Sequence, residues 1–261
     1  MRVARGKPTA IHRASQSLNL VFAVCILLGC AGGKPETKSE PAVSLPGWFW
    51  ETPRRPGVRL AVGYAQFYPD IDASCSLAFA DAALRLWCDR SPRISGGSAT
   101  GYDGAGMMSL GSSFTIDVDT TGFSVFVGGL ARLDSAWSGD LTVALVGTSP
   151  TQISREYREP FPVRELGGLS EKAAIRGLTA SPRYYHSKSS WFEAESQARI
   201  QAALSVKAEI KGESAAADGL MHKVGVIEVD VHLRNVQTIG RAIDADSKTV
   251  WVLVTAEGIE D

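Results

Sequence analysis

Apolar and polar residues follow two periods along the first half of the chain, one typical of a helix and one of a strand. Within residues 70–90, apolar side chains recur at steps of four and three, as at Ala80, Leu84 and Trp87, which predicts a helix. Within residues 113–120, Phe114, Ile116 and Val118 alternate with polar residues, which predicts a half-buried strand. The elements expected in this half are a strand at 60–68, the helix at 70–90, and strands at 113–120, 122–130 and 140–148.

The second half of the chain repeats this order of elements. Its helix is expected to be stronger, because Ser190 and Glu193 have the spacing of a capping box and Gly212 would end it. Glu195 and Arg199 lie four residues apart, a spacing at which opposite charges pair along a helix. The elements expected here are a strand at 175–181, a helix at 189–212, and strands at 225–236 and 248–255.

Short matches between the two halves indicate a duplicated body. They pair Gly63 with Gly177, Ala78–Leu84 with Ala194–Ile200, Ile116 with Ile227, and Thr142 with Thr249, and the offset changes only where loops are expected. The predicted fold is therefore α+β, with two tandem copies of a helix packed on a small antiparallel sheet, each built as strand, helix and three strands. Because one copy has few residues for a core, the copies are expected to pack on each other.

The N-terminus has the pattern of a secretory signal. Four basic and no acidic side chains precede an apolar run at residues 18–29. This run is too short to cross ~30 Å of hydrocarbon as a helix, and a buried core helix is the alternative. The predicted organisation is a lipoprotein signal peptide at 1–29, a flexible tether at 30–46, a first copy at 47–149, a linker at 150–174 and a second copy at 175–261.

The end of the apolar run, Leu27-Leu28-Gly29-Cys30, resembles the lipobox of bacterial lipoproteins. In that family the signal is cut before the cysteine, whose sulfur carries a diacylglycerol and whose amino group carries a third acyl chain such as palmitate. Cys30 is the expected lipidation site, whereas Cys25 follows bulky Val24 and would leave with the signal. Ala31 stands where an aspartate would favour the inner membrane. The resemblance implies a lipid anchor on the periplasmic face of the outer membrane.

Composition narrows the classes of partner. Removing residues 1–29 takes four basic side chains from the 27 basic and 28 acidic ones, which leaves a net charge of −5. This weakly acidic balance argues against nucleic acid as a partner. Cys75 and Cys88 lie in the predicted helix ~20 Å apart, beyond the ~7 Å between Cα atoms that a disulfide allows. They are expected to be unpaired core residues, with a redox or metal role as the alternative.

Several stretches together resemble the LPP-twenty family of bacterial lipoproteins, which includes a flagellar outer-membrane ring lipoprotein. The first half carries PGWFW at 46–50 and AVGYA at 61–65. The second half carries SSWFEAESQAR at 189–199, VHLRNVQTIGRAID at 231–244 and TVWVLV at 249–254. The resemblance implies a small helix-on-sheet fold, attachment to the outer membrane and a non-catalytic role, and it supplies no catalytic residues or cofactor. Two copies in one chain and the glycine-rich stretch at 95–113 depart from the family's usual pattern.

Candidate chemistry is sparse. Asp117 and Asp119 could form an acid/base pair or half a calcium site, and Glu228 and Asp230 have the same spacing in the second half. The alternative is that these carboxylates form the solvent-exposed face of an amphipathic strand, which the alternating pattern predicts without any site. His186, His222 and His232 lack the spacing of a metal motif. The glycine-rich residues 95–106 lack the lysine and following helix of a phosphate loop, so a surface loop is expected there.

The predicted function is that of an outer-membrane lipoprotein without enzymatic activity, a structural or protein-binding module of a flagellar or other envelope assembly. Its expected contacts are the membrane, through the lipid on Cys30, and envelope proteins or further copies of itself; no cofactor or metal is expected. The alternative is a lipoprotein that binds a small ligand or glycan through Trp48, Trp50 and Trp191, residues that could equally pack in the core. A hydrolase that gathers His186 or His222 with the strand carboxylates is a further rival.

Overall fold

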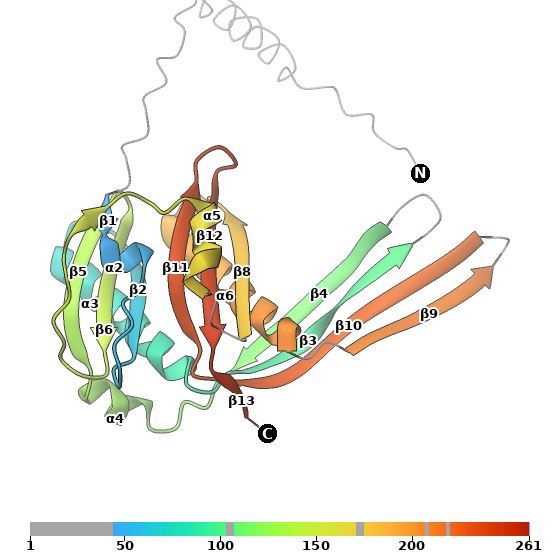
Figure 1. Cartoon of the computed structure of the whole chain (residues 1–261), viewed down its shortest axis with the longest axis horizontal. Helices are drawn as coiled ribbons and strands as arrows, with labels where there is room; N and C mark the ends of the chain where they lie inside the picture. Colours follow the sequence, from blue (N-terminus) through green and yellow to red (C-terminus); the bar gives the residue numbers. More distant parts are fainter. Residues whose placement is uncertain (1–43, 103–106, 171–174, 207–208, 218–219, 261) are drawn as a thin grey trace, which may run out of the picture. The chain divides into compact units, whose positions relative to one another are not determined.

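The computed structural model describes residues 44–102, 107–170, 175–206, 209–217 and 220–260 (Figure 1). Over these residues the chain is a mixed α+β protein with several small antiparallel sheets. Its elements are β1 Leu45–Pro46, α2 Gly47–Trp50, β2 Leu60–Gln66, α3 Ile71–Cys88, β3 Arg93–Tyr102, β4 Met107–Asp117, α4 Phe123–Gly128, β5 Ala131–Ser138, β6 Leu141–Gly147, β7 Tyr157–Arg158, α5 Val163–Leu166, the 3₁₀ helix Gly167–Ser170, β8 Ile175–Pro182, α6 Ser187–Val206, β9 Glu209–Ala217, β10 Leu220–Arg234, β11 Gln237–Asp244, β12 Thr249–Ala256 and β13 Gly258–Glu260. None of the helices in the described part of the chain is long and apolar enough to cross a membrane.

The first three-stranded sheet has the order β2-β6-β5, and helix α3 packs on β2 and β6 (Figure 1). Strand β6 is buried along its whole length, as expected of a central strand covered by a helix. Gly63 in β2 lies where the helix crosses the sheet, and a Cβ there would lie 2.8 Å from the Cα of Ala82. The missing side chain therefore lets α3 approach the sheet closely.

The second three-stranded sheet has the order β8-β12-β11, and helix α6 packs on β8 and β12. A Cβ on Gly177 in β8 would lie 2.7 Å from the backbone nitrogen of Ala202 in α6. Nearby, the hydroxyl of Thr179 donates a hydrogen bond of 2.8 Å to the carbonyl of Ala194. The second helix is thus held against its sheet by the same kind of close backbone approach.

The two long helices begin alike. The backbone N–H of Tyr68 donates to the Ser74 hydroxyl at 2.8 Å, and that of Tyr184 donates to the Ser190 hydroxyl at 2.7 Å. Asp70 also caps α3 by accepting from the backbone N–H of Ala73 at 3.0 Å. The capping box predicted at Ser190 is wrong, because α6 begins three residues earlier and the Ser190 side chain points back to the chain before the helix.

Helix α6 also ends earlier than predicted. It stops at Val206, and Gly212 lies within β9, which pairs with β10 from Glu209 to Ala217. The alanine-rich, charged sequence favours a helix locally, but pairing with β10 overrides that preference.

The third sheet is built from two long hairpins, β3–β4 and β9–β10 (Figure 1). Its order is β13-β10-β3-β4, with β9 also paired to β10. The surface loop predicted at 95–106 is therefore wrong, since residues 95–102 belong to β3, an inner strand paired on both sides. A Cβ on Gly97 would lie 2.6 Å from the carbonyl oxygen of Ile227 in β10, so glycine permits this close pairing. After its helix the first half thus has four strands, β3 to β6, and the second half has five, β9 to β13, where three were predicted for each.

The strand predicted at 122–130 is a short helix. Gly122, with a φ of +84°, precedes α4, and Phe123 and Phe126 on this helix contact the Trp87 ring with centroid distances of 6.0 and 5.1 Å. Phe123 and Phe126 are three residues apart, a spacing that brings side chains together on a helix but separates them in a strand. Packing against Trp87 explains the helical conformation.

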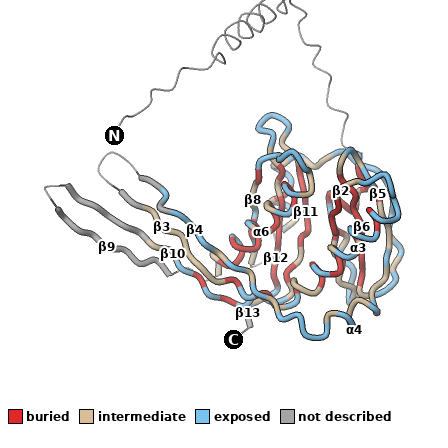
Figure 2. Tube along the Cα trace, turned by 180° about the vertical axis from the view of Figure 1, so that it is seen from behind, coloured by how far each residue is buried: buried red, intermediate tan, exposed pale blue. Residues whose placement is uncertain are grey.

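One buried apolar cluster contains residues from both halves of the body, and Figure 2 shows buried residues in both three-stranded sheets. Helix α6 and strand β11 of the second half contact β2 of the first. The body begins slightly before the predicted end of the tether, because Leu45 in β1 is buried and pairs with β7. The predicted linker 150–174 contains β7, α5 and the 3₁₀ helix.

Candidate functional site

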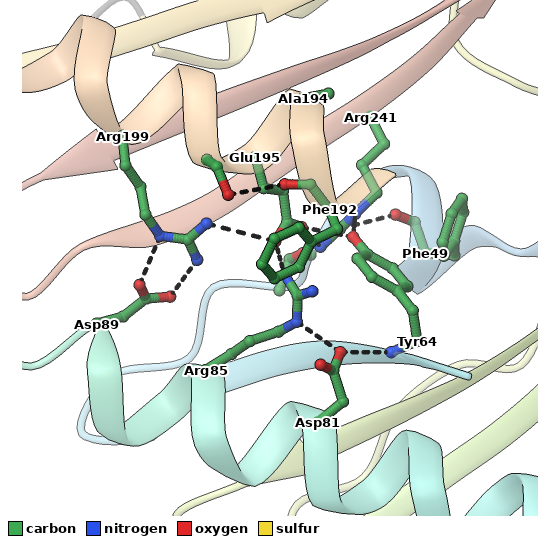
Figure 3. Close-up of polar contacts among 12 residues, drawn as sticks. Phe49, Tyr64, Asp81, Arg85, Asp89, Phe192, Ala194, Glu195, Arg199 and Arg241 are labelled. Atoms are coloured by element: carbon green, nitrogen blue, oxygen red, sulfur yellow. Dashed lines mark hydrogen bonds and ion pairs between the residues drawn. The ribbon is translucent and has the colours of Figure 1, made fainter. Parts of the chain in front are cut away.

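Three carboxylates and three guanidinium groups form a buried network between the two halves (Figure 3). Asp81, Arg85 and Asp89 come from α3 and its C-terminal end, Glu195 and Arg199 from α6, and Arg241 from β11. Their formal charges cancel. The side chain of Asp81 is 18% exposed, and those of the other five are at most 9% exposed. We call this set the charge network.

Glu195 is the centre of the charge network. One carboxylate oxygen, Oε1, accepts from the Tyr64 hydroxyl and from Nη2 of Arg241, the latter at 2.9 Å. The other oxygen, Oε2, accepts from Nη1 of Arg85 and lies 3.5 Å from Nη1 of Arg199. The Glu195–Arg199 pairing predicted from the sequence is present, but in the interior and with two further arginines around the same carboxylate.

Arg241 connects this centre to the N-terminal segment of the body. Its Nη1 donates to the carbonyl of Phe49 at 3.0 Å and to the hydroxyl of Thr52 at 3.1 Å. Its Nε donates to the Tyr64 hydroxyl, which in turn donates to Glu195. A single guanidinium thereby joins β11 to the segment around α2 and to strand β2.

A second ion pair closes the network at the end of α3. Arg199 donates through Nε and Nη2 to the two carboxylate oxygens of Asp89, at 2.8 and 2.9 Å. Burial by itself would lower the pKa of Arg199, but the charge of Asp89 and its hydrogen bonds outweigh burial and raise that pKa. This bidentate geometry fixes the orientation of α6 relative to α3.

Arg85 contributes to the network through both its edge and its face. Its Nε donates to Asp81 at 2.7 Å, and Asp81 also accepts from the backbone N–H of Tyr64 at 2.8 Å. The guanidinium lies over the Tyr64 ring at 4.4 Å from the centroid. Among the described residues, Arg85 Nη2 is one of two buried polar side-chain atoms without a hydrogen-bond partner. Because every carboxylate faces a guanidinium, the network is suited to fixing one arrangement of the two halves.

The structure places Trp48, Trp50 and Trp191 in the core, where each is at most 3% exposed. The indole N–H of Trp48 donates to Asp134 and that of Trp50 donates to the carbonyl of Arg158, both at 2.9 Å. The ring of Trp191 packs edge-on to that of Trp50. These rings stabilise the core, and Trp48 also lines part of a pocket of about 210 Å³, which is smaller than the usual range of small-molecule sites. Cys30 lies outside the described residues.

The carboxylates singled out from the sequence lie on exposed positions. Asp117, Asp119, Glu228 and Asp230 are all exposed, and Asp230 pairs with Arg93 at 2.8 Å. His232 is exposed, as the strand pattern predicted. Within the parts of the chain that the structure describes, no three His, Cys, Asp or Glu side chains are grouped as a metal site would require. His186 is exposed with its ring 4.8 Å from that of Tyr185, and the His222 side chain lies outside the described residues.

Cys75 and Cys88 are both unpaired, as predicted from their separation along one helix. Burial raises the pKa of the Cys88 thiol, and the charge of neighbouring Asp89 acts in the same direction. The thiolate, which is the reactive form, is therefore disfavoured at neutral pH.

Sequence reasoning missed four members of the charge network, Asp81, Arg85, Asp89 and Arg241, and the hydrogen bonds that Tyr64 makes with it. One signal was present: Arg85 lies three residues after Ala82 and seven after Ala78, on the alanine face that packs against the sheet. A charged residue on an apolar helix face requires a buried partner of opposite charge. The partner itself, Glu195, is 110 residues away in the chain.

In comparisons with protein-family models, with characterised proteins and with solved structures, none matches the chain.

Proposed function

We propose that the protein is an outer-membrane lipoprotein with a non-catalytic, protein-binding role in the cell envelope. The support for the location is the order of basic residues, short apolar run and Leu27-Leu28-Gly29-Cys30. The resemblance to the LPP-twenty family supports the same location and a structural role. Lipid on Cys30 would hold the body at the periplasmic face, because several acyl chains make a durable anchor.

We further propose that the body consists of two copies of one α+β unit. In support, the sheets β2-β6-β5 and β8-β12-β11 have the same connectivity, and each is covered by the helix that follows its first strand. The equivalent hydrogen bonds from Tyr68 to Ser74 and from Tyr184 to Ser190 are separated by 116 residues at both partners.

The contacts also favour a different alignment of the first strands. Gly63 lies against the carbonyl of Ala78, and Thr179 donates to the carbonyl of Ala194, so Gly63 corresponds to Thr179 at the same offset of 116. In this alignment Gly63 and Gly177 are two positions apart, whereas the sequence match had placed them at the same position. Two residues leave a strand side chain on the same face, so both glycines still face their helices.

The main support for a protein-binding role is the exposed edge of the outer strand β4. Strand β4 pairs with β3 and stands at the edge of the third sheet. Residues 107–116 contain neither a charged side chain nor a proline. Soluble proteins usually protect a long edge strand with such residues, because its free backbone groups can pair with another chain. This edge is therefore suited to adding a strand from a partner, either an envelope protein or a second copy.

The face of the sheet beside this edge offers room for a partner's side chains. A groove of about 780 Å³ runs over β3, β4 and β10. Its lining residues on β3 and β4 are all glycine, serine or alanine, among them Ser95, Ala99, Gly111 and Ser113. A strand added at β4 could place larger side chains over this groove.

Adding lysines to the edge is expected to abolish association. Ser113 and Thr115 are exposed on β4, so the double variant S113K/T115K should fold normally, while its charges oppose pairing with another strand. For the wild type, we expect light scattering to detect assemblies of the soluble form that begins at Ala31, or cross-linking in cells to capture a partner. The double variant should give neither result. Gln201→Lys, on the exposed side of α6, is the matched control and should behave as wild type.

Two results would count against this role. One is a wild-type protein that stays monomeric at high concentration and forms no cross-linked product in cells. The other is a double variant that keeps the wild-type assemblies and cross-links.

A further inference from the structure

A pocket of about 550 Å³ opens beside the C-terminal end of α3. Its walls are the segment before β2, the turn between β10 and β11, and the chain just after β12. This volume lies within the range of sites that bind small organic molecules. The pocket is separate from the edge strand β4, and ligand binding there would not depend on the lipid anchor.

Arg59 lines this pocket with an unpaired charge. The residue is half-buried, and no hydrogen bond or ion pair of its guanidinium is found among the described residues. Burial lowers the pKa of Arg59, although the charge of Asp89 acts in the opposite direction. A partly desolvated cation without a partner is unfavourable, and proteins ordinarily pair such groups.

The two carboxylates of the pocket are already engaged elsewhere. Asp89 accepts both hydrogen bonds of the bidentate pair with Arg199. Glu257 accepts a hydrogen bond of 2.7 Å from the side-chain amide of Asn235. The charges of both carboxylates act on Arg59, but no ion pair joins either of them to it among the described residues, so its five N–H donors remain available to a ligand.

Other donors and an apolar surface accompany Arg59 in the pocket. Arg55 is exposed at the rim, and neither its side chain nor that of Gln237 has a hydrogen-bond partner among the described residues. Leu60 and Leu86 form part of the apolar lining. A few convergent polar groups beside apolar walls are typical of a site that orients a small ligand.

We propose that this pocket binds a small organic oxyanion, a carboxylate or phosphate, through the Arg59 guanidinium. The planar guanidinium matches two oxygens of either group in a bidentate contact, and Arg55 adds charge at the rim. The apolar part of the ligand lies against Leu60 and Leu86. Uptake of such an anion would neutralise the unpaired cation and leave the Asp89–Arg199 pair intact.

Calorimetric titration tests this proposal. The full-length protein is titrated in detergent, at constant ionic strength, with phenyl phosphate, benzoate and inorganic phosphate as probes. We expect saturable binding of phenyl phosphate or benzoate with a Kd of about 1 mM or tighter. Inorganic phosphate should bind more weakly, because it lacks an apolar part. Arg59→Gln should weaken binding by about tenfold or more, as expected for loss of a charged hydrogen-bonding partner.

Matched variants separate the site from general charge effects. Arg176→Gln removes an exposed arginine on β8 outside the pocket and should leave the Kd unchanged. Arg59→Lys keeps the charge but loses the bidentate fork, so it should bind with intermediate affinity. Arg59→Gln should melt at or above the wild-type Tm without probe, because it removes an unpaired, half-buried cation.

Three outcomes would overturn the proposal. The first is the absence of saturable binding of phenyl phosphate and benzoate. The second is wild-type affinity in both Arg59→Gln and Arg59→Lys. The third is displacement of phenyl phosphate by a lower concentration of short-chain phosphatidylglycerol, which would assign the pocket to a lipid headgroup instead of a free small anion.

Discussion

Replacing Glu195 with glutamine is expected to lower the free energy of unfolding by about 3–5 kcal/mol. The carboxylate is 1% exposed and receives hydrogen bonds from Arg85, Arg241 and the Tyr64 hydroxyl. Without its charge, three buried guanidinium groups would face two carboxylates, and the glutamine NH₂ would oppose other donors. Typical domains have only 5–15 kcal/mol of stability, so a loss of this size is readily measured as a lower urea midpoint.

Glu193→Gln is the matched control, because it makes the same chemical change two residues earlier on α6. Glu193 lies outside the charge network and accepts a hydrogen bond from Gln197 near the surface. Its replacement should change stability by less than about 0.5 kcal/mol. A loss below about 1 kcal/mol for Glu195→Gln, measured beside this control, would show that the charge network does not hold the halves together.

Replacing Gly177 with alanine is expected to destabilise the protein by about 1–3 kcal/mol. The new methyl group would overlap the carbonyl of Ala198 and lie 2.7 Å from the backbone nitrogen of Ala202. Both are main-chain atoms of α6, so the overlap can be relieved only by moving the helix away from β8. The same reasoning applies to Gly63→Ala, where the methyl group would meet the backbone of Ala78 and Ala82 in α3. Thermal and urea unfolding measure both effects.

Gly128→Ala provides the contrast for these glycine variants. A Cβ at Gly128 meets no atom within 4 Å, and the residue is the last of helix α4. Alanine should therefore be neutral or stabilising by up to about 1 kcal/mol. Equal stability of Gly177→Ala, Gly63→Ala and Gly128→Ala would contradict this explanation. It would show that the close contact between helix and sheet does not require glycine at positions 63 and 177.

The sequence pattern was sufficient for elements with a clear apolar signature. Helix α3 and strands β6 and β12 follow the predicted segments closely, because α3 has apolar residues at helical spacing and the two central strands are short apolar runs. Strands β3 and β9 were not predicted, since their small residues carry no apolar alternation. Their conformation depends on pairing with β10, a partner distant in sequence from β3. The prediction of a strand at α4 failed for a related reason, because the helix is stabilised by Trp87, which lies outside the segment.

The charge network could be anticipated only in part. The Glu195–Arg199 spacing was visible, but an i, i+4 pair on a helix is normally a surface feature of small energy. Its burial follows from Arg85 and Arg241, which reach Glu195 from elements 110 and 46 residues away in the chain. The unpaired charge at Arg59 had no sequence signature either, because it is defined by what the neighbouring carboxylates already bind.

The lipid on Cys30 is the premise of the proposed function, and the mass of the mature protein tests it most directly. Mass spectrometry of protein from the membrane fraction should show an N-terminus at Cys30 that carries a diacylglyceryl thioether and an N-acyl chain. Cys30→Ala should lack these groups and lose its membrane association, while the body folds as in the wild type. A wild-type protein without acyl groups, or a Cys30→Ala variant that fractionates with membranes like the wild type, would contradict the account.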